Sequence, residues 1–208
     1  MKQFLTVEER FAVEARVKAA EKVTSGEIVV MVVPSSHHYH AASLVGSTAG
    51  SMILAILSAW MYGSQSMWVF LAFFGVFFIL LNEIIKRNDL FKRFFVKRQE
   101  MAEEVEEGAV RSFYHSKVNE TAQHTGILLY ISIFEHRVRV LADTGISGKI
   151  EQHRWQEVAD MIIGGIRTGR QSEAICKAVD RCAAMLQEHF PRRQDDSNEL
   201  GDVVIIGR

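Results

Sequence analysis

The sequence predicts an α/β protein: a small mixed sheet with helices on its faces, interrupted by an inserted transmembrane helical hairpin. Three observations predict it. Residues 41–82 carry no charged side chain, a dense run of basic residues follows them, and helical and strand periodicities alternate on both sides. The uncharged stretch is about twice as long as the ~20 residues that a helix needs to cross a bilayer, so two spans fit better than one.

The composition leaves room for one modest soluble domain beside the apolar stretch. The 208 residues carry a formal net charge of −1, so bulk charge gives no indication of nucleic acid, and no nucleic-acid partner is expected. Cys176 and Cys182 are expected on different faces of one helix and therefore not in a disulfide, which fits a reducing compartment. The opening residues MKQFLTVEERF contain no apolar run, so no signal peptide is expected.

Residues 1–36 are predicted to form the first part of the soluble domain. A helix is expected over 6–23, because Thr6 and Glu9 have the spacing of a capping box. Its apolar line repeats every fourth residue, opposite charged positions, and is expected to be the buried face. This line consists of Val7, Phe11, Ala15 and Ala19. The run EIVVMVV at 27–33 is apolar almost throughout and predicts a buried central strand.

Residues 41–85 are predicted to form the hairpin, with spans over about 41–62 and 67–85 and an uncharged turn between them. Small residues recur at every fourth position of the first span. They are Ala42, Gly46 and Gly50. Such a stripe allows two helix backbones to approach closely, either within the hairpin or against a partner.

Residues 86–98 are predicted to form a basic amphipathic segment that meets anionic headgroups of the lipid bilayer. Its cations are Lys86, Arg87, Lys92, Arg93, Lys97 and Arg98. Because the turn of the hairpin has no basic residue, the positive-inside rule predicts a multi-pass protein of the inner (plasma) membrane with both termini and the soluble domain in the cytoplasm. Since no Gly or Pro lies between Gly75 and Gly108, the second span is expected to continue into the next helix.

Residues 99–208 are predicted to form the remainder of the soluble domain. The expected elements are a helix over 99–118, strands over 126–135 and 137–143, helices over 150–167 and 171–188, and a strand over 203–206. The expected buried line of the first of these helices is Ala102, Val105, Ala109 and Phe113. A hairpin turn is expected at Glu135 and His136.

Four carboxylates are candidate ligands for a divalent cation, Ca²⁺ or Mg²⁺, both of which prefer oxygen. They are Asp143, Asp195, Asp196 and Glu199. Asp143 follows a strand and is equally suited to capping the next turn, and the other three equally suit a solvated loop. His37, His38 and His40 suit either a transition metal or the membrane interface. The sequence contains no arrangement typical of a catalytic nucleophile.

The string TGILLYISIFEHRVRVLADTGI at 125–146 resembles the TPM domain family, most closely its bacterial branch of predicted membrane proteins. The run SGEIVVMVV at 25–33, Trp155, the Phe190-Pro191 helix end and Asn198-Glu199-Leu200 extend the resemblance. It implies an α/β/α fold and a membrane-tethered or extracytoplasmic protein. Some members of the family are linked to phosphatase activity, divalent-cation binding, repair of a photosynthetic membrane complex or an auxiliary role at a receptor. Many carry Asp-Asn-Gly where this chain has His124-Thr125-Gly126.

These observations favour a membrane-anchored TPM-domain protein that binds or regulates another membrane protein, or associates with itself. The resemblance leaves a divalent-metal-assisted phosphatase using Asp143 and the C-terminal acidic loop as the alternative. A pore formed by oligomerised hairpins ranks last, because neither span has a polar stripe beyond its small residues.

Overall fold

The structure, a computed structural model, describes residues 4–37, 39–63, 65–192, 199–201 and 204–207. The chain divides into two compact units. One, here called the sheet unit, consists of Met1–Ser36 and Ala102–Arg208, and the other, the hairpin unit, of His37–Met101. The segment that forms the hairpin unit therefore interrupts the sheet unit in the sequence, and each unit is described by itself.

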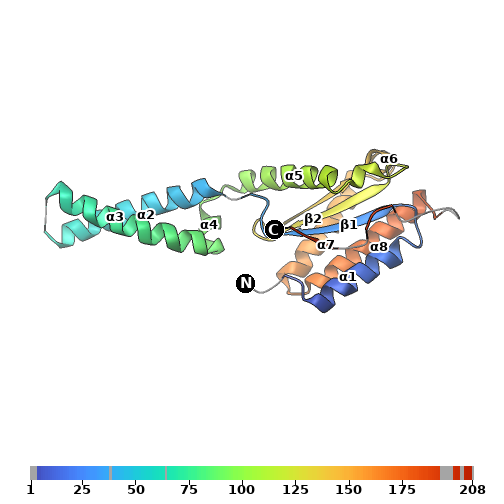
Figure 1. Cartoon of the computed structure of the whole chain (residues 1–208), viewed down its shortest axis with the longest axis horizontal. Helices are drawn as coiled ribbons and strands as arrows, with labels where there is room; N and C mark the ends of the chain where they lie inside the picture. The colour runs from blue at the N-terminus through green and yellow to red at the C-terminus, as the bar shows by residue number, and fades with distance from the viewer. Residues whose placement is uncertain (1–3, 38, 64, 193–198, 202–203, 208) are drawn as a thin grey trace. The chain divides into compact units, whose positions relative to one another are not determined.

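The sheet unit contains a four-stranded mixed sheet (Figure 1). Its strands are β1 (Glu27–Val33), β2 (Gly126–Ser132), β3 (Arg137–Ala142) and β4 (Ile205–Ile206). Their order is β3-β2-β1-β4, with β1 parallel to both β2 and β4 and β3 antiparallel to β2. The predicted strands are confirmed, including the central position of β1 and the edge position of β4.

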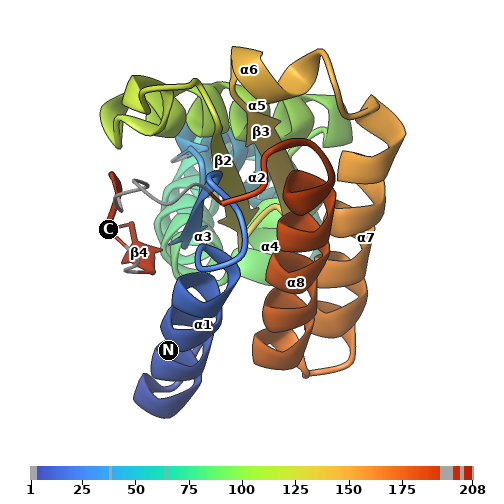
Figure 2. The same ribbon diagram turned by 90° about the vertical axis from the view of Figure 1, so that its right-hand side faces the viewer.

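Helices cover both faces of this sheet, as Figures 1 and 2 show. The helices α1 (Val7–Ala20), α7 (Gln152–Arg167) and α8 (Gln171–His189) lie on one face, and α5 (Arg98–His115) lies on the other. The four-residue helix α6 (Thr144–Ser147) and the 3₁₀ turn η1 (Val118–Glu120) lie in the connections. The predicted α/β/α sandwich is therefore confirmed.

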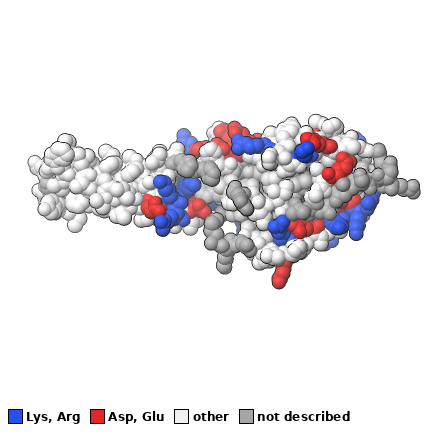
Figure 3. Space-filling view, in the orientation of Figure 1, with Lys and Arg blue, Asp and Glu red and all other residues white. Residues whose placement is uncertain are grey.

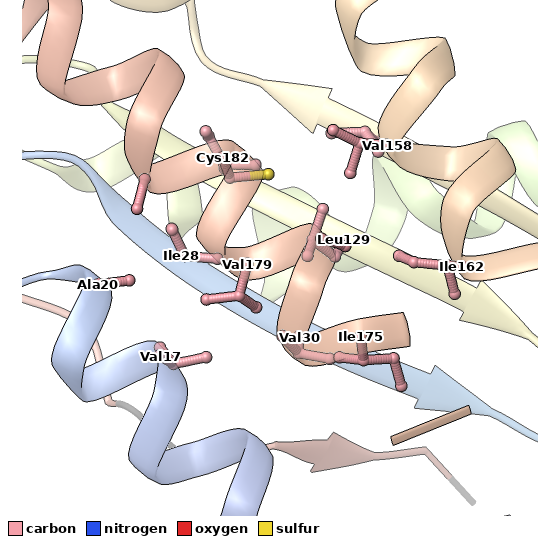
Figure 4. Packing of buried hydrophobic residues seen from close by; sticks show 14 of the residues in the cluster. Val17, Ala20, Ile28, Val30, Leu129, Val158, Ile162, Ile175, Val179 and Cys182 are labelled. Atoms are coloured by element: carbon pink, nitrogen blue, oxygen red, sulfur yellow. The ribbon is translucent and has the colours of Figure 1, made fainter. Parts of the chain in front are cut away.

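Alternation along the two central strands explains why both are continuously apolar. Ile28, Val30 and Val32 of β1 belong to the larger core cluster, which α1, α7 and α8 complete (Figure 4). Val29 and Met31 belong to the second cluster, with Val105, Ala109 and Phe113 of α5. A strand whose successive side chains enter two cores has no solvent-facing side, so its sequence does not alternate between apolar and polar.

The buried face of α1 differs from the predicted one. The capping box is confirmed: the Thr6 N–H donates to Glu9 Oε2 at 2.8 Å, and the Glu9 N–H donates to Thr6 Oγ1 at 3.1 Å. The buried side chains, however, are Val13, Val17 and Ala20. The predicted line is exposed; its members are Val7, Phe11, Ala15 and Ala19. Both lines have helical spacing, and the choice between them is made by packing against α8 and the sheet.

The hairpin unit contains α2 (His40–Met61), α3 (Met67–Arg87) and α4 (Asp89–Phe94). The predicted continuation of the second apolar helix into α5 is wrong. Asn88 has an extended backbone, and its side chain accepts a hydrogen bond from the Leu90 N–H at 3.1 Å. An asparagine that caps a new helix competes with continuation of the old one, so no Gly or Pro is needed for the break.

The predicted buried line of α5 is confirmed at three of its four positions. Val105, Ala109 and Phe113 are buried, but Met101 is buried in place of Ala102, which is half-buried. Met101 precedes Val105 by four residues and therefore lies on the same face of α5.

The reassigned face of α1 can be tested with a matched pair of variants. Val13 is fully buried, whereas Phe11 is 65% exposed. We expect Val13→Ala to lower the free energy of unfolding of the sheet unit by about 1.5–3 kcal/mol, and the larger truncation Phe11→Ala by less than about 0.5 kcal/mol. Thermal unfolding of both purified variants measures the difference. A larger loss of unfolding free energy for Phe11→Ala than for Val13→Ala would show that the face predicted from the sequence is the buried one.

Candidate functional site

The hairpin unit exposes an unusually long apolar surface. Two helical segments, Ala41–Met61 and Met67–Arg87, are long and apolar enough to cross a membrane. In the most apolar 18-residue window of each, only 28% and 6% of the residues are buried. Figure 3 shows that most of this hairpin carries no charged side chain. A core helix of a water-soluble protein with this composition is mostly buried, so these two helices are candidate membrane spans.

Small residues of α2 form the inner face of the hairpin. A β-carbon at Gly50 would lie 2.9 Å from Leu81 Cδ1, and one at Gly46 would lie 2.7 Å from the ring of Phe95. Ala42, the third member of the predicted stripe, is buried. The same face includes buried Ser43, Ser47, Ser51 and Ala55. Glycines at these positions therefore admit neighbouring side chains that a larger residue would displace.

The predicted membrane-surface cations lie at the open end of the hairpin (Figure 3). Lys86 and Arg87 end α3, Lys92 and Arg93 lie on α4, and Lys97 and Arg98 join it to α5. The Arg87 Nε donates to Glu83 Oε1 at 2.7 Å. Contact with headgroups stays a prediction for all six.

Asp143 lies in the sheet unit, between β3 and α6, and its side chain is buried. Its Oδ1 accepts a hydrogen bond from the Thr144 N–H at 2.7 Å and caps α6. Its Oδ2 lies 3.1 Å from Nδ1 of His124, a residue with a left-handed backbone (φ 53°). This is the turn-capping role that the sequence allowed. The ligand role stays a prediction.

The remaining candidate ligands do not assemble around Asp143 in the described part of the chain. The Glu199 carboxylate accepts a hydrogen bond from the Ala122 N–H at 2.7 Å, and the backbone N–H of Glu199 donates one to Glu27 Oε1 at 3.2 Å. Among the described residues, no group of three or more His, Cys, Asp and Glu side chains has an arrangement that could hold a metal ion. Asp195, Asp196 and His38 lie outside the described residues.

A buried polar cluster that the sequence does not predict lies at the other end of the central strands. Glu135 is only 2% exposed, although it lies in a turn. Its Oε1 accepts hydrogen bonds from the Ser36 N–H at 3.0 Å and from Ser35 Oγ at 3.2 Å, and Ser132 Oγ donates to its Oε2. No local pattern indicates this burial, because two of the donor residues, Ser35 and Ser36, lie about a hundred residues away in the sequence.

Tyr130 completes this polar cluster and packs closely against α5. Its hydroxyl lies 3.2 Å from Ser36 Oγ. A β-carbon at Gly108 would lie 2.7 Å from the Tyr130 hydroxyl oxygen, so a larger residue at this position of the helix would displace the Tyr130 side chain. Burial raises the pKa of Tyr130 above its ordinary value, and the Ser36 hydroxyl opposes this shift.

The cysteines are unsuited to nucleophilic chemistry. Cys182 lies in the larger core cluster, where desolvation raises its pKa to about 12. Burial likewise raises the pKa of Cys176, which is half-buried. Since the thiolate is the reactive species, both thiols stay neutral at physiological pH.

Comparison with known proteins gives a family match over part of the chain and a fold. Residues 93–185 match a family model described as the TPM domain. The whole chain (100%) is similar to 98% of the BA42 protein from the psychrophilic bacterium Bizionia argentinensis, solved by NMR, with 18% sequence identity and a TM-score of 0.63. At this identity the likeness shows the fold alone. No curated protein matches.

The two roles of Asp143 can be separated by substitution. We expect Asp143→Ala to lower the free energy of unfolding by about 1 kcal/mol and Asp143→Asn to change it by a few tenths, because Asn caps helices as well as Asp does. Thermal unfolding with and without Ca²⁺ or Mg²⁺ measures both roles. A cation-dependent rise in the wild-type melting temperature that Asp143→Asn abolishes would identify a metal ligand rather than a cap.

Proposed function

We propose that this chain, which contains a TPM domain, is anchored in a bacterial inner membrane by α2 and α3 and presents the domain to the cytoplasm as a binding or regulatory module for a membrane-protein partner. The observation that carries the anchoring is the exposure of α3, whose most apolar window is only 6% buried. The sheet unit carries the TPM match at residues 102–185, and its own core needs none of these apolar side chains.

The energetic argument favours lipid as the surroundings of the hairpin. Trp68, Ile79 and Leu80 of α3 are 76%, 68% and 54% exposed. Transferring each large apolar side chain out of water is worth about 1.5–3 kcal/mol. A contiguous surface built from many such side chains is typical of a membrane or protein interface rather than of a solvated monomer.

The ends of the hairpin support the orientation. Trp60, Tyr62 and Trp68 lie near the turn and are more than 70% exposed, where aromatic side chains suit a membrane–water interface. The opposite end carries the six predicted membrane-surface cations, from Lys86 to Arg98. The positive-inside rule favours the cytoplasm for that end and therefore for the sheet unit, into which the chain continues.

The chemistry of the sheet unit favours binding over catalysis. Its two thiols are held neutral by burial, and the carboxylates of Asp143 and Glu199 accept backbone hydrogen bonds. The metal-assisted phosphatase alternative lacks, among the described residues, a group of three His, Cys, Asp and Glu side chains that could hold its metal ion.

A charge placed in α3 tests the anchor. Val76 is 57% exposed in the middle of α3, and Val110 is 39% exposed on α5. An arginine near the centre of a membrane span costs about 2.5–3.5 kcal/mol on insertion. We expect Val76→Arg to reduce the carbonate-resistant membrane fraction several-fold and Val110→Arg to leave it unchanged. Recovery of the wild-type protein from the aqueous fraction without detergent would overturn the proposal.

Reporter fusions and co-purification test sidedness and role. We expect an alkaline-phosphatase reporter to be active when inserted at the Gly63 turn and inactive at either terminus. We also expect a different membrane protein to co-purify stoichiometrically from native membranes. An active reporter at a terminus would reverse the orientation. Recovery of this chain without any other membrane protein would contradict the proposed partner.

A further inference from the structure

The outer edge of β3 is open for strand pairing. Among the described strands, β3 lies at one end of the sheet and pairs with β2 alone. The Asp143 N–H donates to the Gly126 carbonyl at 2.9 Å and so extends the hydrogen bonds between β3 and β2 by one residue. The backbone of Asp143 therefore points toward β2. Because alternate residues of an antiparallel strand turn toward its neighbour, Arg137, Arg139 and Leu141 point their backbone groups at β2.

The backbone N–H and C=O groups of Val138, Val140 and Ala142 consequently point away from the sheet. Within the described ranges, these three residues make no backbone or side-chain hydrogen bond outside the ladder. An edge with a row of such groups is a template for another strand unless something covers it.

A groove of about 470 Å³ runs beside this edge. One wall is formed by residues 139–142 of β3. The other is formed by residues 147–151, which precede α7, and by Gln152 and Trp155 of α7. Ligand-binding clefts commonly have volumes of about 300–1,000 Å³, so this groove has room for a short extended segment.

We propose that an extended peptide segment of a protein partner adds to β3 as a further strand, with its main chain bonded to Val138, Val140 and Ala142. This inference rests on the proposed role as a binding module and identifies the surface and the form of the partner. Main-chain hydrogen bonds supply affinity in this mode of recognition, and alternate side chains supply specificity.

The side chains at the edge define the chemistry of that peptide. Val138 and Val140 face the larger core cluster, on the side of Trp155. Arg137 and Arg139 alternate with them and point to the opposite face, where Arg139 forms an ion pair with Glu106 of α5 (Nε to Oε2, 2.6 Å) and keeps further guanidinium donors for a peptide carboxylate. Lys149 lines the groove beside Trp155, with its Nζ 4.2 Å from the ring centre of Phe190. The acidic member of the lining, Glu151, lies 2.9 Å from His153. The edge therefore fits a strand in which apolar and acidic residues alternate.

The same side chains disfavour a second copy of this chain as the occupant. Antiparallel pairing of β3 with β3 would place Arg137 and Arg139 of both copies on one face of the joined sheet. In the registers that place these arginines opposite one another, the like charges are destabilising, and charged edge strands are a common defence against self-pairing.

N-methylated peptides test this inference on the full chain in nanodiscs. The probe is an eight-residue peptide of alternating Val and Glu. One derivative is N-methylated at every Val, and the other at every Glu. All Val N–H groups of a strand point to one edge and all Glu N–H groups to the other, so methylation blocks one edge at a time.

We expect the unmodified peptide to slow amide exchange of Val138, Val140 and Ala142 at least tenfold while leaving Ile205 and Ile206 of β4 unchanged. Only one of the two methylated derivatives should retain binding. In an antiparallel peptide the Val N–H groups face β3, so the Glu-methylated derivative binds. In a parallel peptide the Glu N–H groups face β3, so the Val-methylated derivative binds. Arg137→Glu should weaken binding about tenfold and favour a Val–Lys peptide, whereas the control Arg167→Glu should do neither.

Three results would overturn the inference: no protection by millimolar peptide, equal binding of both methylated derivatives, or protection that rises with protein concentration without peptide, which would assign the edge to a second copy. Failure here leaves the anchoring and co-purification results unaffected, so it is distinguishable from failure of the proposed function.

Discussion

The parallel pairing of β1 with β2 is the constraint on which the rest of the sheet unit depends. Seven consecutive residue pairs, from Glu27 with Gly126 to Val33 with Ser132, join two segments that the hairpin unit separates in the sequence. Parallel strands cannot be joined by a tight turn, so the chain must leave the end of β1 and return along a face of the sheet. The helix α5 makes this return, and the hairpin is inserted before it.

This arrangement explains how a domain accommodates an apolar insertion. The two strands are buried on both faces by clusters that draw on residues before and after the insertion. At the point where the chain leaves β1, Ser35 and Ser36 are hydrogen-bonded to the buried carboxylate of Glu135. The end of β1 is thereby fixed within the sheet unit. A long insertion at such a fixed surface point costs little loop-closure entropy.

Local patterns predict the structure correctly where local and global preferences agree. The capping box of α1 and the doubly buried β1 follow from patterns within a few residues, and the structure confirms them. Local patterns fail where two local solutions are equivalent. Val7 and Phe11 repeat with helical spacing as well as Val13 and Val17 do, and only contacts with distant elements decide which pair is buried. The end of α3 at Asn88 was missed for a related reason, because a side-chain cap overrode helix propensity.

The sequence by itself determined the fold class, the two long apolar helices and the charge gradient at their end, because these depend on composition and periodicity over tens of residues. Only the tertiary structure decided which carboxylates are buried and what they do. Asp143 caps α6 beside His124, and Glu135 binds the serines that follow β1. The edge position of β3 among the described strands also emerged only from the strand order. Such features join residues far apart in the sequence, and their energies depend on desolvation and pairing that no local pattern records.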